Sequence, residues 1–216
     1  MQGLADPDQR FVDEVVTIAA MHSTSPESTQ RTLRFMALAA FASMASMRVC
    51  DPMLPALSQE FNVSTGDASA VIAAFAVAYG VLQLFYGPLG DRLGKTRVVL
   101  GATSACAFFS AITALAPNIT ALVVSRAAMG ASAAGIIPLC MAWIGDQVPY
   151  EQRQETLAGL MVATVSGMMA GQWFGGFAVE ALGWRVAFGV LAFLFATAAT
   201  LLWRQVNAST PGVGSA

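Results

Sequence analysis

Gly-Pro-Leu-Gly-Asp-Arg-Leu-Gly-Lys-Thr-Arg, residues 87–97, is a short charged run between two long apolar stretches, residues 68–86 and 98–116. A helix needs about 20 mainly apolar residues to cross a bilayer, and each flanking stretch approaches that length. Charged residues gather in the run and are absent from both neighbours. The pattern therefore predicts two membrane-spanning helices joined by a polar loop.

The same alternation continues in both directions along the chain. Six stretches are long and apolar enough to span a membrane, namely 33–52, 68–86, 98–116, 119–143, 157–179 and 186–203. The whole sequence of 216 residues is 56% hydrophobic and 11% charged, with a mean hydropathy of +0.62. Because soluble domains carry about 25% charged residues, a soluble globule is excluded. We expect an all-α membrane protein in which residues 33–204 form a six-helix bundle.

Basic residues lie mainly on one side of these spans, and this bias sets the expected orientation. The residues on that side are Arg10, Arg31, Arg34, Arg92, Lys95, Arg97, Arg153 and Arg204. The positive-inside rule then puts both termini in the cytoplasm, and an even number of spans agrees. We expect a protein of the cell (inner) membrane with a cytoplasmic tail at 1–32. Residues 205–216 are interpreted as the start of a central cytoplasmic linker.

Several function classes are excluded by what the sequence lacks. The net charge is −2 with no basic block, so nucleic acid is not an expected partner. The single histidine, His22, lies outside the spans, and Cys50, Cys106 and Cys140 form no CxxC motif. We therefore expect no metal, no cofactor and no intramembrane enzyme. No GxxxxGK[ST] motif is present, so ATP is not the expected driving force.

An internal repeat points toward transport. Residues 83–94 resemble residues 172–183 at an offset of 89, with five of twelve positions identical. The first copy ends the second span on the inner side, whereas the second copy ends the fifth span on the outer side. This arrangement predicts two three-helix units of opposite orientation, a 3+3 inverted repeat. Inverted repeats favour a transporter that works by alternating access.

Ionisable residues within the spans are candidates for function, because a charge in the bilayer is costly unless it is paired or hydrated. Arg48 and Asp51 are close enough along a helix to pair, and Pro52 and Pro55 should bend or end that helix. Two interpretations stay open: an interfacial salt bridge, or proton exchange at an Asp51 that faces an aqueous path.

Arg126 in the fourth span has no acid nearby in sequence. Its side chain either extends to the outer interface or points inward to a cavity. Gly130 and Ala134 on the same stripe allow a neighbouring helix to approach closely and favour the inward alternative. Tyr79 and Gln83, one turn apart on the second span, are weaker candidates for lining a cavity.

The fifth span carries a stripe of glycines, Gly167, Gly171, Gly175 and Gly176. Such a stripe predicts close packing against another helix. Whether it also forms a gating seam is left open by the spacing.

The run at 87–97 resembles the motif that major facilitator superfamily transporters carry between their second and third helices. The matching residues are Gly87, Leu89, Asp91, Arg92, Gly94, Lys95 and Arg97. The resemblance implies a cytoplasmic gate in which Asp91 contacts a helix of the second half and a basic residue pairs with Asp146. Lys95 stands where arginine is usual, so a point charge replaces a bidentate donor.

Other stretches resemble the same superfamily. Leu122, Arg126, Gly130, Ala133 and Ala134 resemble its fourth-helix motif, whose arginine is linked to proton transfer. The glycine stripe resembles its fifth-helix antiporter motif, although Gln172 stands where proline is expected. Asp51–Pro55 and Gly183–Arg185 resemble drug-efflux members.

The resemblance covers residues 33–204, which is half of a transporter with twelve or fourteen helices. It implies proton-coupled export of a small organic solute by alternating access, with Asp51 and Arg126 as coupling candidates. Three alternatives remain: an uptake symporter for a sugar or organic acid, a truncated half without transport of its own, and a half-size protein that pairs with a second copy. The expected partner that completes the cavity is the missing C-terminal six-helix half or a second copy.

Overall fold

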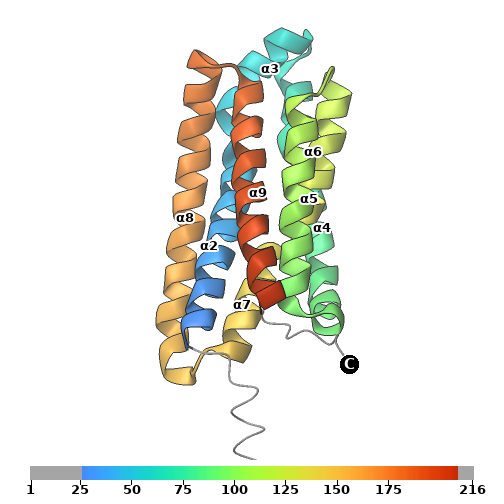
Figure 1. The fold of residues 1–216 in the computed structure, drawn as a ribbon. Helices are drawn as coiled ribbons and strands as arrows, with labels where there is room; N and C mark the ends of the chain where they lie inside the picture. The colour runs from blue at the N-terminus through green and yellow to red at the C-terminus, as the bar shows by residue number, and fades with distance from the viewer. Residues whose placement is uncertain (1–25, 209–216) are drawn as a thin grey trace, which may run out of the picture.

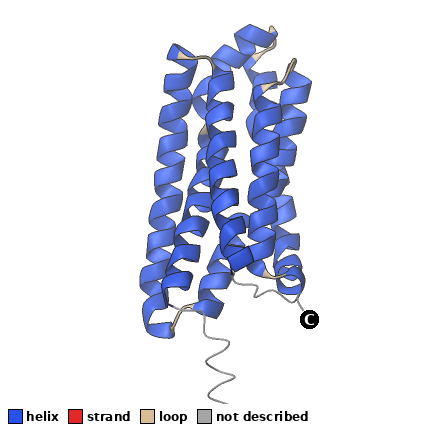
Figure 2. Cartoon of the chain, in the orientation of Figure 1, coloured by secondary structure: helices blue, strands red, loops and turns tan. Residues whose placement is uncertain are grey.

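The structure is a computed structural model and describes residues 26–208, which form a bundle of long helices (Figures 1 and 2). In chain order the elements are α2 (Pro26–Arg48), η1 (Asp51–Met53), α3 (Leu54–Phe61), α4 (Thr65–Leu93), α5 (Lys95–Ala114), α6 (Ile119–Ala133), α7 (Ile136–Gln147), α8 (Tyr150–Ala181) and α9 (Trp184–Ala208). Six candidate membrane spans are found in this part of the chain, as predicted. Residues 1–25 of the expected tail and 209–216 of the expected linker lie outside the described residues.

Several helices extend beyond the apolar stretches from which they were predicted. The expected polar loop at 87–97 is wrong in this respect: α4 continues through Pro88 to Leu93, and α5 begins at Lys95. Only Gly94 lies between the two helices, with a φ of 89° that favours glycine. The length of an apolar stretch indicates how much of a helix lies inside the bilayer. The helix itself can continue into the polar region on either side.

Two spans contain breaks. The first span leaves α2 at Arg48, makes one 3-10 turn at η1 and continues as α3. Pro52 and Pro55 lie in the first turns of η1 and α3, where a missing N–H has no cost, so the bend expected from these prolines is present. The fourth span is divided into α6 and α7 around Gly135.

The helix pairings follow the inverted repeat. The most extensive contacts join α2 with α8, α4 with α6, and α5 with α9. If spans one to three are exchanged with spans four to six, the pair of first and fifth spans (α2–α8) becomes the pair of fourth and second spans (α6–α4). The pair of third and sixth spans (α5–α9) is unchanged by the exchange. The offset of 89 also relates Gly94 to Gly183, the two glycines of positive φ (89° and 88°), each followed directly by a helix.

Small residues let these pairs approach backbone to backbone. A Cβ added to Gly130 would collide with the backbone of Phe75 in α4. A Cβ at Gly167, Gly171 or Gly175 would likewise meet the α2 backbone or its extension at Val49. Gly176 differs, because a Cβ there would make an ordinary 3.7 Å contact with Pro52. Three of the four predicted stripe glycines are thus positions where only glycine fits.

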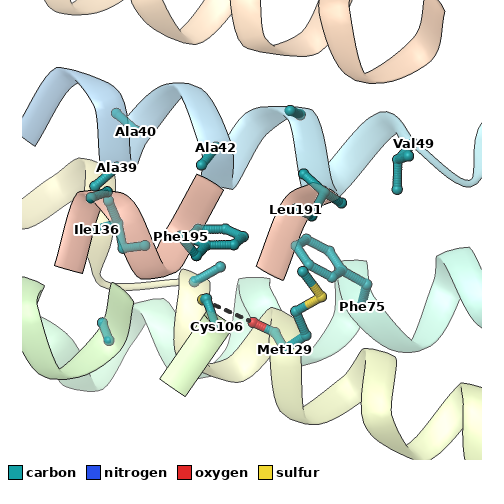
Figure 3. Packing of buried hydrophobic residues seen from close by; sticks show 14 of the residues in the cluster. Ala39, Ala40, Ala42, Val49, Phe75, Cys106, Met129, Ile136, Leu191 and Phe195 are labelled. Atoms are coloured by element: carbon teal, nitrogen blue, oxygen red, sulfur yellow. Dashed lines mark hydrogen bonds between the residues drawn. The ribbon is translucent and has the colours of Figure 1, made fainter. Parts of the chain in front are cut away.

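The core of the bundle lies between the helices that these contacts bring together. Phe75, Met129, Leu191 and Phe195 are buried at its centre, and the Cys106 thiol lies 3.8 Å from the Met129 carbonyl oxygen (Figure 3). All three cysteines are buried and unbridged. In contrast, α4 and α8 carry exposed apolar side chains, among them Val77, Leu84, Phe85, Val162, Met169 and Trp173.

The α2–α8 contact gives the first testable prediction. Gly171→Ala would place a methyl group 2.6 Å from the Ala45 Cα atom, so the helices must separate. Overpacking of this kind costs about 1–3 kcal/mol, and we expect a lower thermal midpoint (Tm) in detergent. Gly159→Ala is the matched control on the same helix, because nothing lies within 4 Å of its Cβ position. Equal Tm values for the two variants would contradict the packing argument.

Candidate functional site

A charge cluster joins three helices at the junction of α4 and α5. The Lys95 ammonium donates to the Asp146 carboxylate over 2.5 Å and lies 3.4 Å from the Asp91 carboxylate. Asp91 belongs to the last turn of α4, Lys95 opens α5 and Asp146 is near the end of α7. These residues are called the Lys95 cluster, and this end of the bundle the Lys95 end. One cation thus holds two carboxylates from different helices.

Close packing next to the cluster fixes its geometry. Gly90 is buried, and a Cβ at this position would overlap the Leu139 side chain of α7. The next residue, Asp91, lies at the surface, where 71% of its side chain is exposed. Gly87, in contrast, has nothing within 4 Å of its Cβ position. Of the two glycines, Gly90 is therefore the one that the contact between α4 and α7 requires.

Tyr86 supports the break in the fourth span. Its hydroxyl donates to the carbonyl oxygens of Ala131 (3.0 Å) and Ser132 (3.3 Å). These carbonyls lie in the last turn of α6, where a helix leaves acceptors without intrahelical donors. The Tyr86 ring also covers Gly135, at which a Cβ would collide with it. This α4 side chain therefore stabilises the bend between α6 and α7.

A cleft of about 530 Å³ opens beside the Lys95 cluster. Its lining includes Thr32, Asp91, Lys95, Trp143, Asp146 and Gln205. Five helices contribute to its walls, so the cleft is where their ends converge. Arg97 also lines it, whereas Leu89 and Arg92 are exposed on α4. Among the described residues, neither Arg92 nor Arg97 forms an ion pair with a carboxylate.

Arg126 lies in the interior, fully buried where α2, α4, α6 and α9 meet. Its Nη1 atom donates to the Ser46 carbonyl oxygen over 3.0 Å, and the guanidinium carbon lies 4.2 Å from the centre of the Phe75 ring. Within residues 26–208, its Nε and Nη2 atoms have no hydrogen-bond partner. The Arg126 side chain therefore points inward, where a carbonyl oxygen and an aromatic ring hold the buried guanidinium; that it reaches a cavity stays a prediction.

Among residues 26–208, none of the other predicted residues forms a hydrogen bond or ion pair with Arg126. Arg48 donates to Asp51 over 3.0 Å, and this pair joins the end of α2 to η1. Tyr79 is half-buried and stacks on Phe75, with ring centres 6.1 Å apart. Gln83 is exposed on α4. The pairing of Asp51 with Arg48 agrees with the salt-bridge interpretation and leaves Asp51 partly exposed.

Comparison with known proteins identifies the family to which this architecture belongs. Residues 36–215 match the sequence profile of the Major Facilitator Superfamily. A solved structure of the POT family transporter PepTSo superposes with a TM-score of 0.72 at 18% identity, over 82% of this chain and 37% of that one. The fold and the motifs together define a multi-pass membrane protein of transporter type. The chain belongs to the major facilitator superfamily.

Named relatives are transporters of differing kinds. The inner membrane transport protein YnfM of Escherichia coli is 23% identical over 83% of this chain and 43% of its own length. The hexuronate transporter of the same organism is 31% identical over 70% of this chain and 36% of its own. The MFS antiporter QDR3 of Candida albicans is 26% identical over 76% of this chain and 24% of its own length. The chain spans less than half the length of these relatives.

Arg126 gives the second prediction. A buried charge without a carboxylate partner weakens the fold, and an apolar side chain of similar length removes that cost. We expect Arg126→Met to leave Tm unchanged or raise it while abolishing transport. The measurements are Tm in detergent and flux in proteoliposomes, with Arg126→Lys as the variant that keeps the charge. A Tm loss as large as that of Gly171→Ala would instead make Arg126 a structural residue.

Proposed function

We propose that this chain forms one six-helix bundle of a secondary active transporter that works by alternating access. A second six-helix bundle, from the same longer polypeptide or from a second copy, would cover the exposed faces of α4 and α8 and complete the substrate path. The observation that carries the proposal is the Lys95 cluster, in which Lys95 joins Asp91 and Asp146 at the meeting point of α4, α5 and α7.

The Lys95 cluster is suited to act as a gate. Its charges are partly exposed, with 20% of the Lys95 side chain and 51% of the Asp146 side chain accessible, so they exchange partners at a small cost. Asp91 makes only the longer contact to Lys95 and is free to accept from a helix end of the second bundle. Formation and loss of that contact would accompany closing and opening of this end.

Proton-coupled export of a small organic solute is the mode that we favour. Arg126 is a buried cation without an ion pair among residues 26–208, and Asp51 is a partly exposed carboxylate toward the opposite end from Lys95, so these two residues are the coupling candidates. The likeness to an MFS antiporter supports an exchange mechanism. Uptake of a sugar or organic acid is the second candidate, because a hexuronate transporter is 31% identical.

The distribution of basic residues orients the chain. Arg31, Arg34, Lys95 and Arg153 lie toward the end of the bundle where α2 begins and α9 ends (Figure 1). By the positive-inside rule this Lys95 end faces the cytoplasm, in the inner membrane of the cell. Both termini are then cytoplasmic, and the gate formed by the Lys95 cluster is the cytoplasmic one.

The gate gives the third prediction. Asp91→Asn removes one of the two carboxylate charges beside Lys95, the one left for the second bundle, so the end should close poorly and the transport rate should fall at least about tenfold, equivalent to about 1.4 kcal/mol. Flux is measured with the natively expressed protein in proteoliposomes under a pH gradient. Glu155→Gln, a neutralised exposed acid on α8, is the matched control. Unchanged flux in Asp91→Asn would refute the gate assignment.

Direction of flux gives the fourth prediction. With an inward proton gradient, cells that express the protein are expected to export ethidium, an organic cation, and not to accumulate glucuronate. Ethidium fluorescence and radiolabelled glucuronate measure the two activities in the same cells, with Arg126→Met as the inactive control. Proton-dependent glucuronate uptake without ethidium export would replace the export proposal by the symport alternative.

A further inference from the structure

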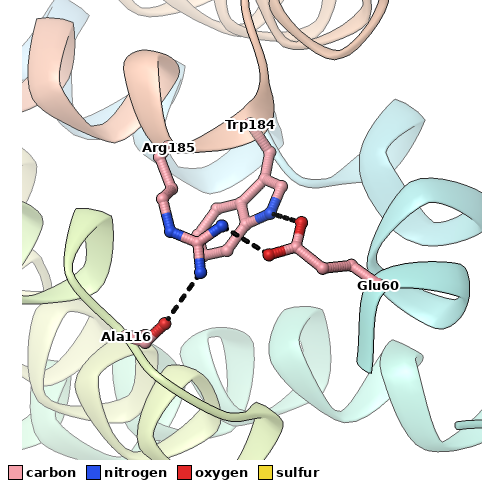
Figure 4. Close-up of polar contacts among 4 residues, drawn as sticks. All are labelled: Glu60, Ala116, Trp184 and Arg185. Atoms are coloured by element: carbon pink, nitrogen blue, oxygen red, sulfur yellow. Dashed lines mark hydrogen bonds and ion pairs between the residues drawn. The ribbon is translucent and has the colours of Figure 1, made fainter. Parts of the chain in front are cut away.

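A second polar cluster lies at the opposite end of the bundle, called the Glu60 end. Both oxygens of the Glu60 carboxylate are engaged: the Trp184 indole N–H donates to one over 2.5 Å, and Arg185 pairs with the other (Figure 4). A second nitrogen of Arg185 donates to the Ala116 carbonyl oxygen over 3.2 Å. These four residues are called the Glu60 cluster.

The cluster joins parts of the chain that are distant in sequence. Glu60 is in the last turn of α3, Ala116 follows the end of α5, and Trp184 and Arg185 open α9. The guanidinium carbon of Arg185 lies 4.3 Å from the centre of the Trp184 ring, which orients both donors toward the carboxylate. Trp184 is almost fully buried and packs on Phe61 and Phe188. The Glu60 carboxylate therefore joins α3 to the start of α9, and Arg185 links both to the end of α5.

The internal repeat relates this cluster to the Lys95 cluster. The offset of 89 carries Gly94 onto Gly183 and Lys95 onto Trp184, so each cluster starts at the helix that follows a glycine of positive φ. In both cases the helix start contacts an acid near the end of a broken span, Asp146 in α7 or Glu60 in α3. The charges are inverted: one cation holds two acids at the Lys95 end, and one acid holds two donors at the Glu60 end.

We infer that the Glu60 cluster is the counterpart of the Lys95 gate and stabilises closure of the opposite membrane face. This inference rests on the proposed alternating-access function. The cluster fixes α3 on α9, and α3 is the broken extension of the first span, so loss of the Glu60 contacts releases the segment that η1 already separates from α2. Glu60 acts through the position of α3 and is a positioning residue rather than a substrate ligand.

The contacts themselves are tested by a double-mutant cycle on Tm. Glu60→Gln and Arg185→Gln should each lower Tm by a few degrees in the natively expressed protein, and the double variant should lose no more than the larger single loss. Trp184→Phe, which keeps the ring and removes the donor, should resemble Glu60→Gln. Glu180→Gln, an exposed acid at the same end, is the control and should have no effect. Additive losses would overturn the cluster.

The gating role is tested by cysteine labelling in the same protein. The buried native cysteines give a low background, and cysteines replace Phe177 toward the Glu60 end or Phe85 toward the Lys95 end, on the faces left for a second bundle. Glu60→Gln should accelerate maleimide labelling at position 177 several-fold and slow it at 85, and Lys95→Met should do the reverse. If Glu60→Gln leaves the labelling rates at positions 177 and 85 unchanged, or changes both in the same direction, the inference is overturned.

Failure of the proposed function has a different signature. If the chain does not belong to an alternating-access transporter, Lys95→Met will not change labelling at either end, and flux will be absent in the wild type. The double-mutant cycle remains interpretable in that case, because it measures Tm alone. An additive cycle with intact transport would reject the Glu60 cluster and leave the proposed function in place.

Discussion

Contact between helix backbones is the constraint on which this bundle depends. Lipid is as apolar as leucine, so the hydrophobic effect does little to hold helices together inside a membrane, and close van der Waals packing must do it. Gly130 against Phe75 and Gly171 against Ala45 provide that contact in the two repeat-related pairs, α4–α6 and α2–α8. With those pairs set, α5 and α9 meet between them, and the polar residues at both ends are brought within reach of one another.

The polar clusters at the two ends of the bundle differ in their chemistry. At the Lys95 end the contacts are made by a long, partly exposed lysine side chain between the more exposed carboxylates of Asp91 and Asp146. At the Glu60 end an indole ring that is almost fully buried orients the donors, which makes the contact more rigid. An exposed point charge exchanges partners readily, whereas a buried aromatic donor needs its surroundings to move. A transporter with these ends would be expected to open more easily at the Lys95 end.

Local sequence predicted those features that depend on local composition. The six spans, the bend at Pro52 and the glycine stripe at Gly167, Gly171 and Gly175 follow from apolar length, a missing N–H and a missing side chain. The helical course of residues 87–93 was not predicted, because polarity marks the edge of the bilayer and not the end of a helix. Tyr86 and Glu60 gave no signal, since their partners lie 45 and 124 residues away and become neighbours only in the folded bundle.

Arg126 bears on how the chain enters the membrane. The fourth span carries this cation with no acid between Ile119 and Gly145, and an arginine in an isolated helix is costly to insert, by up to about 2.5–3.5 kcal/mol at the helix centre. The hydrogen-bond acceptor Ser46 in α2 and the nearer ring, Phe75 in α4, belong to spans that are synthesised earlier, whereas the more distant Phe188 ring in α9 follows later. The fourth span is therefore expected to leave the translocon against helices already in place, so that biogenesis of the bundle is cooperative rather than helix by helix.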